Sequence, residues 1–123
     1  MKKNLMMVTG LTLLLWTSVG FADWKEDYRK AISRQNFSDA VRIAKGQAEQ
    51  GNAEAQNNLG LLYINGQGVS KDEVEGLSLL MVAAKNGSSN ANQNSEFLKT
   101  RMQKEHIDKA SDIAKNHRWQ RNR

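Results

Sequence analysis

The stretch AEAQNNLGLLYINGQGVSKDEVEGLSLLMVAAKNG, residues 53–87, decides the fold. Small residues occur where two helices must pack closely, such as Gly60 in the first half and Ala83 in the second. Between the halves, Gly66 and Gly68 provide the backbone freedom that a tight reversal of the chain needs. The pattern predicts a helix, a turn and a second helix, a unit that more often makes contacts than performs chemistry.

This unit resembles a Sel-like repeat (SLR), the short-helix relative of the tetratricopeptide repeats. The matching positions are Ala53, Ala55, Leu59, Gly60, Tyr63, Gly66, Gly68, Val69, Asp72, Ala83, Ala84 and Gly87. Two positions depart from the family pattern: Ser70 stands where proline is usual, and Gly76 where alanine is usual. Because glycine inside a helix costs about 1 kcal/mol relative to alanine, we expect the second helix either to be weakened at Gly76 or to be closely approached there by a neighbour.

A partial copy of the unit precedes it at a distance of 36 residues. Residues 48–51, AEQG, align with residues 84–87, AKNG. Apolar residues recur at helical spacing on both sides of the central unit, and no segment of comparable length alternates with a period of two. A period in the mid-thirties is typical of helix-pair solenoids.

We therefore predict an all-α fold, a short right-handed α-solenoid of about three helix hairpins. Its domain, residues 23–118, divides into a partial repeat (24–51), a full repeat (52–87) and a C-terminal capping helix pair (88–118). A basic tail follows over residues 119–123. Three hairpins are about the minimum for such a stack, because each pair buries its apolar face only against its neighbours.

Residues 1–22 have the pattern of a cleaved signal peptide. Two lysines precede an apolar run over residues 5–16, and Gly20 and Ala22 fit the small-residue positions before a signal-peptidase site. An uncleaved anchor is disfavoured, because the run is shorter than the roughly 20 residues of a membrane span. We expect a bacterial protein of the periplasm or the medium, with no membrane span after cleavage.

The charge of the chain is weakly basic, with 18 Lys and Arg residues against 13 Asp and Glu. The excess is concentrated in residues 115–123, KNHRWQRNR. Such a segment can bind nucleic acid or an anionic membrane surface, but a frayed, solvated terminus is the commoner explanation. Because export also disfavours nucleic acid, we expect no nucleic-acid partner.

Metal and cofactor signatures are absent from the sequence. The chain has no cysteine, which excludes disulfides and thiolate metal sites. Its two histidines, His106 and His117, have no accompanying metal-binding motif. No nucleophile elbow, phosphate-binding glycine loop or dinucleotide fingerprint occurs. We predict no metal, no cofactor and no enzyme activity.

Acidic residues are the best candidates for chemistry. They cluster at Glu26 and Asp27 and again over residues 72–75. Paired carboxylates can serve as acid and base in glycoside cleavage when burial separates their pKa values. The second cluster, however, occupies the opening turn of a predicted helix, where the helix dipole favours negative charge and Asp72 can cap the backbone. We favour the structural interpretation.

We expect the protein to be a monomer that binds a protein or peptide of the cell envelope as an adaptor or scaffold. The family resemblance implies a concave surface lined by the first helix of each pair, here at Glu54, Asn57, Leu61 and Ile64. Asparagine amides can hold a peptide backbone by donating and accepting at once. The alternative for these positions is that Asn57 is solvated and that Leu61 completes the core.

Two other functions remain open. The first is a cell-envelope hydrolase that uses Glu26, Asp27 or Asp72 as its catalytic carboxylates. The second is an inhibitor of a secreted toxin or enzyme, which is a binding function with a narrower purpose.

Overall fold

The computed structural model describes residues 24–120 and shows an all-helical chain. The helices are α2 (Trp24–Ser33), α3 (Phe37–Glu49), α4 (Ala53–Asn65), α5 (Glu73–Lys85), α6 (Ser89–Lys99) and α7 (Lys104–Lys115). No strand occurs among these described residues, which confirms the predicted all-α class. The predicted leader, residues 1–22, and the last three residues of the predicted tail, 121–123, lie outside the described part of the chain.

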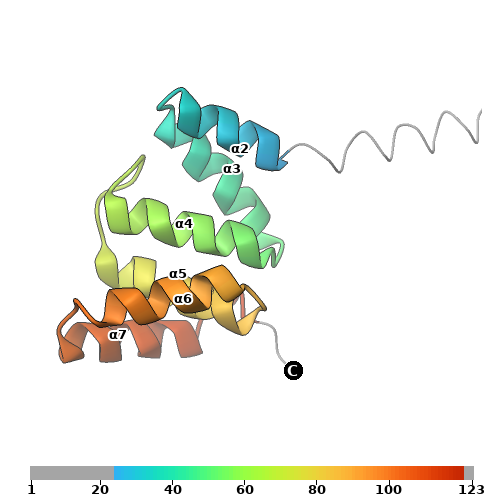
Figure 1. The fold of residues 1–123 in the computed structure, drawn as a ribbon. Coiled ribbons are helices and arrows are strands. Elements are labelled where there is room, and N and C mark those ends of the chain that lie inside the picture. Colours follow the sequence, from blue (N-terminus) through green and yellow to red (C-terminus); the bar gives the residue numbers. More distant parts are fainter. Residues whose placement is uncertain (1–23, 121–123) are drawn as a thin grey trace, which may run out of the picture.

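The helices are stacked in chain order along the molecule (Figure 1). α2 and α3 form one end, α4 crosses the middle, and α5, α6 and α7 form the other end. α5 is the central element, since it packs against α4, α6 and α7. Contacts also join α4 to α6, the first helices of two neighbouring hairpins. This arrangement is compatible with a short helical-repeat solenoid.

Helix boundaries recur at a spacing of 36 residues. The first residues of α3 and α5, Phe37 and Glu73, are 36 positions apart, and so are those of α4 and α6, Ala53 and Ser89. The residue before each of these four helices is a capping residue whose side chain accepts a hydrogen bond from a backbone N–H three positions later. These caps are Asn36, Asn52, Asp72 and Ser88. The expected capping role of Asp72 is confirmed. α7 breaks the spacing, because it begins earlier, at Lys104.

The turn between α4 and α5 depends on its two glycines. Gly66 and Gly68 have φ angles of 63° and 73°, which side chains rarely tolerate. A side chain on Gly68 would also collide with the backbone carbonyl of Phe37. The turn therefore lies directly against the start of α3, and the predicted reversal at these glycines is confirmed.

α4 and α5 approach each other closely at Gly60 and Gly76. A methyl group on Gly60 would lie 3.0 Å from the carbonyl oxygen of Gly76. A methyl group on Gly76 would lie 2.5 Å from Cγ1 of Ile64. Of the two expectations for Gly76, close approach by a neighbour is therefore the one that the structure confirms.

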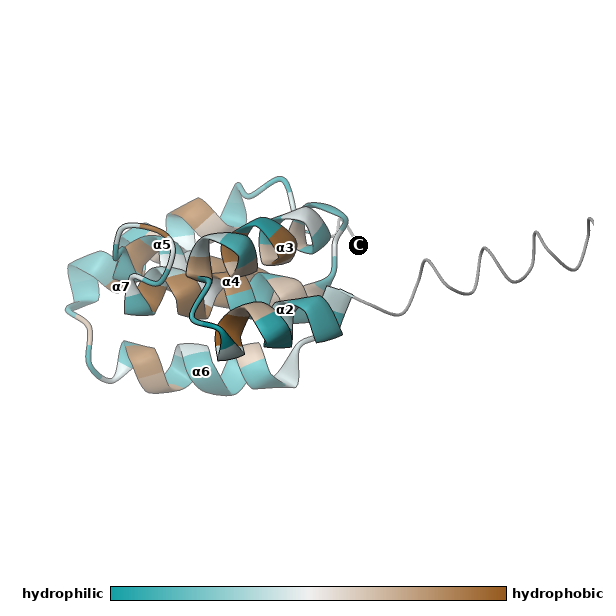
Figure 2. Cartoon of the chain, turned by 90° about the horizontal axis from the view of Figure 1, so that it is seen from above, coloured by the Kyte–Doolittle hydropathy of each residue, from teal (hydrophilic) through white to brown (hydrophobic). Residues whose placement is uncertain are grey.

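The apolar core consists of two clusters that share α5. The buried members of the first are Ala31, Ala40, Ala44, Ala48, Ala55, Leu59, Leu62 and Leu79. Those of the second are Leu77, Leu80, Ala83, Ala91, Leu98 and Ala110. Because Leu79 and Leu80 belong to different clusters, α5 joins the two halves of the stack. Helices such as α3 and α6 carry both apolar and polar residues (Figure 2), as expected for helices that are buried on one face only.

Candidate functional site

The four residues predicted to line a binding surface all belong to α4, but they lie in different surroundings. Glu54 is exposed, and its Oε2 is 2.6 Å from Nζ of Lys25 on α2. Asn57 is only 5% exposed, and its Oδ1 accepts a hydrogen bond of 3.0 Å from Nδ2 of Asn94 on α6. Asn57 is therefore not solvated; its amide oxygen links two helices of the stack.

Leu61 and Ile64 contribute mainly to packing. Both are half-buried and contact the second core cluster. Ile64 also lies against Gly76, where α5 comes close to α4. Leu61 therefore lies at the edge of the core, half-buried against the second cluster. Of the four predicted residues, Glu54 is the one whose side chain is exposed.

Two neighbouring hollows meet at Glu54. The first, about 140 Å³ in volume, lies between α2 and α4, and the second, about 320 Å³, lies between the N-terminal ends of α4 and α6. The first is lined by Trp24, Lys25, Tyr28, Arg29, Glu54 and Asn58. The second is lined by Ala53, Glu54, Gly87, Ser88, Ser89 and Asn90. We refer to the two hollows together as the Glu54 groove.

The groove offers aromatic surface, hydrogen-bonding groups and an ion pair. Nζ of Lys25 lies 5.8 Å from the centre of the Trp24 ring as well as beside Glu54. Burial raises the pKa of the Tyr28 phenol, which keeps it neutral and able to donate a hydrogen bond. The side chains of Lys25 and Glu54 are 49% and 51% exposed. Because exposed ion pairs contribute only about 0–1 kcal/mol, a ligand can open this one at little cost.

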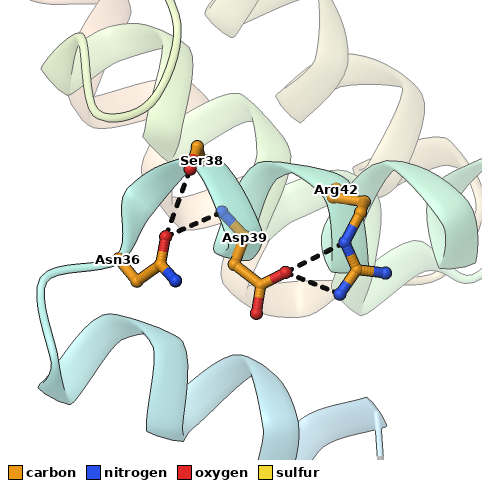
Figure 3. A network of polar contacts seen from close by, with 4 residues as sticks. All are labelled: Asn36, Ser38, Asp39 and Arg42. Atoms are coloured by element: carbon orange, nitrogen blue, oxygen red, sulfur yellow. Dashed lines mark hydrogen bonds and ion pairs between the residues drawn. The ribbon is translucent and has the colours of Figure 1, made fainter.

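A third hollow, about 260 Å³ in volume, lies between α2 and α3, and its polar groups already serve local structure. The Asn36 side chain accepts hydrogen bonds from the Ser38 hydroxyl at 3.1 Å and from the Asp39 backbone at 3.3 Å (Figure 3). Asp39 in turn accepts from the Arg42 guanidinium, with 2.9 Å to Nε. These contacts cap α3 and stabilise its first turn. They give the polar groups of this hollow a structural explanation.

The carboxylates considered as catalytic candidates have different surroundings. Glu26 lies near two cations of its own helix, 3.6 Å from Arg29 and 3.9 Å from Lys30. Asp27 lines the hollow between α2 and α3. Asp72 caps α5 by accepting from the Glu75 backbone N–H at 3.0 Å.

Glu75 and Tyr63 are the two groups near Asp72 with perturbed acidity. Burial, followed by the charge of Asp72, raises the pKa of Glu75. Burial, then Glu75 and Asp72, raises the pKa of Tyr63. Within residues 24–120, no group of three or more His, Cys, Asp or Glu side chains is arranged to hold a metal ion.

The end of the described chain is docked on the helices, which corrects the expectation of a frayed terminus for Trp119 and Gln120. Trp119 packs against the first core cluster, and Nδ2 of Asn86 donates a hydrogen bond of 2.7 Å to its carbonyl oxygen. Gln120 accepts a hydrogen bond of 2.9 Å from Nζ of Lys85. Basic residues dominate the sequence of this segment, whereas Trp119, its one apolar residue, contacts the core.

Sequence reasoning missed most of the groove. Trp24 and Tyr28 contact the first core cluster, and they also line the first hollow. Lys25, Arg29 and Asn58 had no motif to mark them. The available signal was that α2 places an aromatic residue and a cation side by side twice, in Trp24–Lys25 and Tyr28–Arg29, one helical turn apart.

The chain matches no protein-family model and no curated protein. None of the helices between residues 24 and 120 is long and apolar enough to cross a membrane. The geometry of the stack and of the Glu54 groove is therefore the basis for a functional assignment.

Proposed function

We propose that this chain is a small SLR-type helical-repeat protein, exported through the leader predicted at residues 1–22, that binds a peptide segment of another envelope protein in the Glu54 groove. Two observations support the repeat assignment: the motif over residues 53–87 and the 36-residue spacing of helix starts. The observation that carries the binding function is the pair of hollows that meet at Glu54.

The size and composition of the groove favour an extended peptide. Volumes of about 140 and 320 Å³ lie at or below the lower end of the range for drug-sized ligands, and they suit individual side chains of a peptide that crosses from α2 to α6. Trp24 and Tyr28 provide rigid aromatic surface, the kind that dominates binding energy at interfaces. The Asn58 amide can both donate to and accept from a peptide backbone.

The partner can be captured from the groove itself. A photo-cross-linking amino acid at Asn90, an exposed residue of the second hollow, is expected to trap the partner in intact cells. The same amino acid at Lys109, an exposed residue of α7 outside the groove, is the matched control. The partner is then purified, and its binding is measured by calorimetry. Equal cross-linking from both positions would argue against a specific groove.

Charge reversal at the ion pair tests the groove directly. Lys25→Glu and Glu54→Lys are each expected to weaken binding of the purified partner by about tenfold or more, which corresponds to about 1.4 kcal/mol. Helicity should be unchanged, because the pair is half exposed. The double exchange Lys104→Glu with Asp108→Lys, at an exposed 2.8 Å pair on α7, is the control and should leave affinity unchanged. Full affinity in both single variants would refute the proposal.

A further inference from the structure

The last described residues of the chain bridge helices from different hairpins. Trp119 packs on the first core cluster and accepts a hydrogen bond from Asn86, the C-cap of α5. Gln120 accepts from Lys85 of α5, and the Gln120 side-chain amide donates to the Ala114 carbonyl of α7. We call residues 117–120 the C-terminal latch.

The latch is held together by a histidine that must be neutral. The Trp119 backbone N–H donates a hydrogen bond of 3.2 Å to Nδ1 of His117. An acceptor Nδ1 places the proton of the neutral ring on Nε2. The two rings are also in contact, with 4.7 Å between their centres. Protonation of His117 would turn Nδ1 into a hydrogen-bond donor. Two N–H donors would then face each other, and the hydrogen bond from the Trp119 N–H would be lost.

The charges around His117 also oppose its protonation. Burial and the neighbouring Arg118 both lower its pKa from the ordinary value of 6.5. Lys115, at the end of α7, and Lys85, which α5 contributes to the latch, are further cations. Glu49 of α3 brings an anion to the latch, and its carboxylate lies 3.8 Å from the Arg118 guanidinium.

The Trp119 ring offers a charged His117 little compensation. An imidazolium beside an indole gains a cation–π attraction. The guanidinium of Arg118, however, already lies 5.9 Å from the centre of the same ring, so a second cation there would be repelled by the first.

We propose that the C-terminal latch is a pH-sensitive switch, closed over the ends of α3 and α5 while His117 is neutral and released when His117 is protonated. The direction of this pH dependence follows from linkage, because His117 binds a proton more tightly in the open latch than in the closed latch. Acidification below about pH 6.5 therefore raises the ratio of open to closed molecules. At full protonation, the ratio of open to closed molecules rises about tenfold for each unit by which the pKa of His117 in the open latch exceeds its pKa in the closed latch.

Fluorine NMR of the chain labelled with 5-fluorotryptophan tests this proposal. The Trp119 signal is assigned by its loss in Trp119→Phe. Between pH 7.5 and 5.0 it is expected to move toward the position of solvent-exposed tryptophan, with the same midpoint as the His117 ring protons. The Trp24 signal should stay in place, since Trp24 belongs to α2. A Trp119 signal that does not move, or one that moves together with Trp24, would overturn a local latch.

Substitution of the two histidines provides matched controls. His117→Gln removes the titrating group without adding charge, so the pH response of Trp119 should disappear. His106→Gln changes the other histidine of the chain, an exposed residue of α7, and should leave the midpoint unchanged. His117→Lys carries a permanent charge and should show the open Trp119 signal at pH 7.5. An unaltered titration in His117→Gln would refute the role of His117 even if that variant is less stable.

Discussion

Asn86 donates a 2.8 Å hydrogen bond to the side chain of Gln56 inside the stack, and Gln56 is fully buried. The amide of Gln56 in turn donates to the carbonyl oxygen of Ala48 at 3.1 Å. One buried side chain of α4 thus joins the end of α3 to the C-cap of α5. Because buried polar groups are costly without partners, this connection holds successive hairpins in a defined register.

Gln56→Leu is expected to destabilise the fold. Leucine fills similar space, but it leaves the Ala48 carbonyl and the Asn86 amide without this partner, which costs about 1–3 kcal/mol. Gln93→Leu, at an exposed position of α6, is the control and should change stability by less than about 0.5 kcal/mol. Urea denaturation followed by circular dichroism measures both. Equal midpoints for the two variants would show that the buried amide does not contribute to stability.

Gly76→Ala tests the close approach of α4 and α5. Alanine has the better helix propensity, by about 1 kcal/mol, but its methyl group would lie within 2.5 Å of Ile64. Overpacking of this kind typically costs about 1–3 kcal/mol, so we expect a net loss of stability.

Gly46→Ala is the matched control for Gly76→Ala. Gly46 also lies within a helix, α3, but a methyl group there would meet nothing within 4 Å. This substitution should therefore raise the free energy of unfolding by about 0.5–1 kcal/mol. Opposite signs for the two variants in thermal denaturation are the expected result, and a gain at both positions would contradict the close contact.

The helical architecture could be predicted from sequence because it depends on local signals. Three of these signals depend only on residues that are close in sequence: the glycines at 66 and 68, the cap at Asp72 and the apolar spacing. All three predictions are confirmed. The docking of Trp119 could not be predicted in this way. It depends on a surface formed by helices that are distant in sequence.

The candidate site was less predictable for the same reason. Whether a residue of α4 faces solvent or protein depends on where α6 lies. The spacing of residues in the sequence does not predict the position of α6. Asn57 therefore became a buried link to Asn94, while the adjacent Asn58 lines the first hollow. The contribution of α2 to that hollow also depends on how the first hairpin packs against the second.

Substitution of Asp72 separates the capping role from a catalytic one. Asp72→Ala removes the acceptor for the Glu75 N–H and should cost about 1 kcal/mol of stability. Asp72→Asn keeps a capping oxygen but removes the charge, so it should cost only a few tenths of a kcal/mol. If a hydrolase activity on peptidoglycan fragments exists, catalysis by Asp72 requires Asp72→Asn to abolish it. Turnover that persists in the stably folded Asp72→Asn variant would exclude this carboxylate as the catalyst.

Glu75→Gln is expected to stabilise the protein at neutral pH. The pKa of Glu75 is raised in the fold by burial and by Asp72, so the folded state favours the protonated form. The stability that Glu75 contributes is therefore fully present at pH values below 4.5, its pKa in the unfolded chain, and it is lost as the pH rises through the pKa of Glu75 in the fold. Because Glu75 is only half-buried and lies in the first turn of α5, where the helix dipole favours its charge, the gain should stay below about 1 kcal/mol.

Glu73→Gln, in the same turn, is the control for Glu75→Gln. Glu73 is exposed and lies 3.7 Å from Lys71, so its substitution removes favourable charge interactions and relieves no burial. We expect Glu73→Gln to lose a few tenths of a kcal/mol at pH 7, whereas Glu75→Gln gains stability there and shows no gain at pH 4. Urea denaturation at the two pH values measures both. If Glu75→Gln instead lost as much stability at pH 7 as Glu73→Gln, the Glu75 carboxylate would be favourably solvated in the fold, which would contradict its raised pKa.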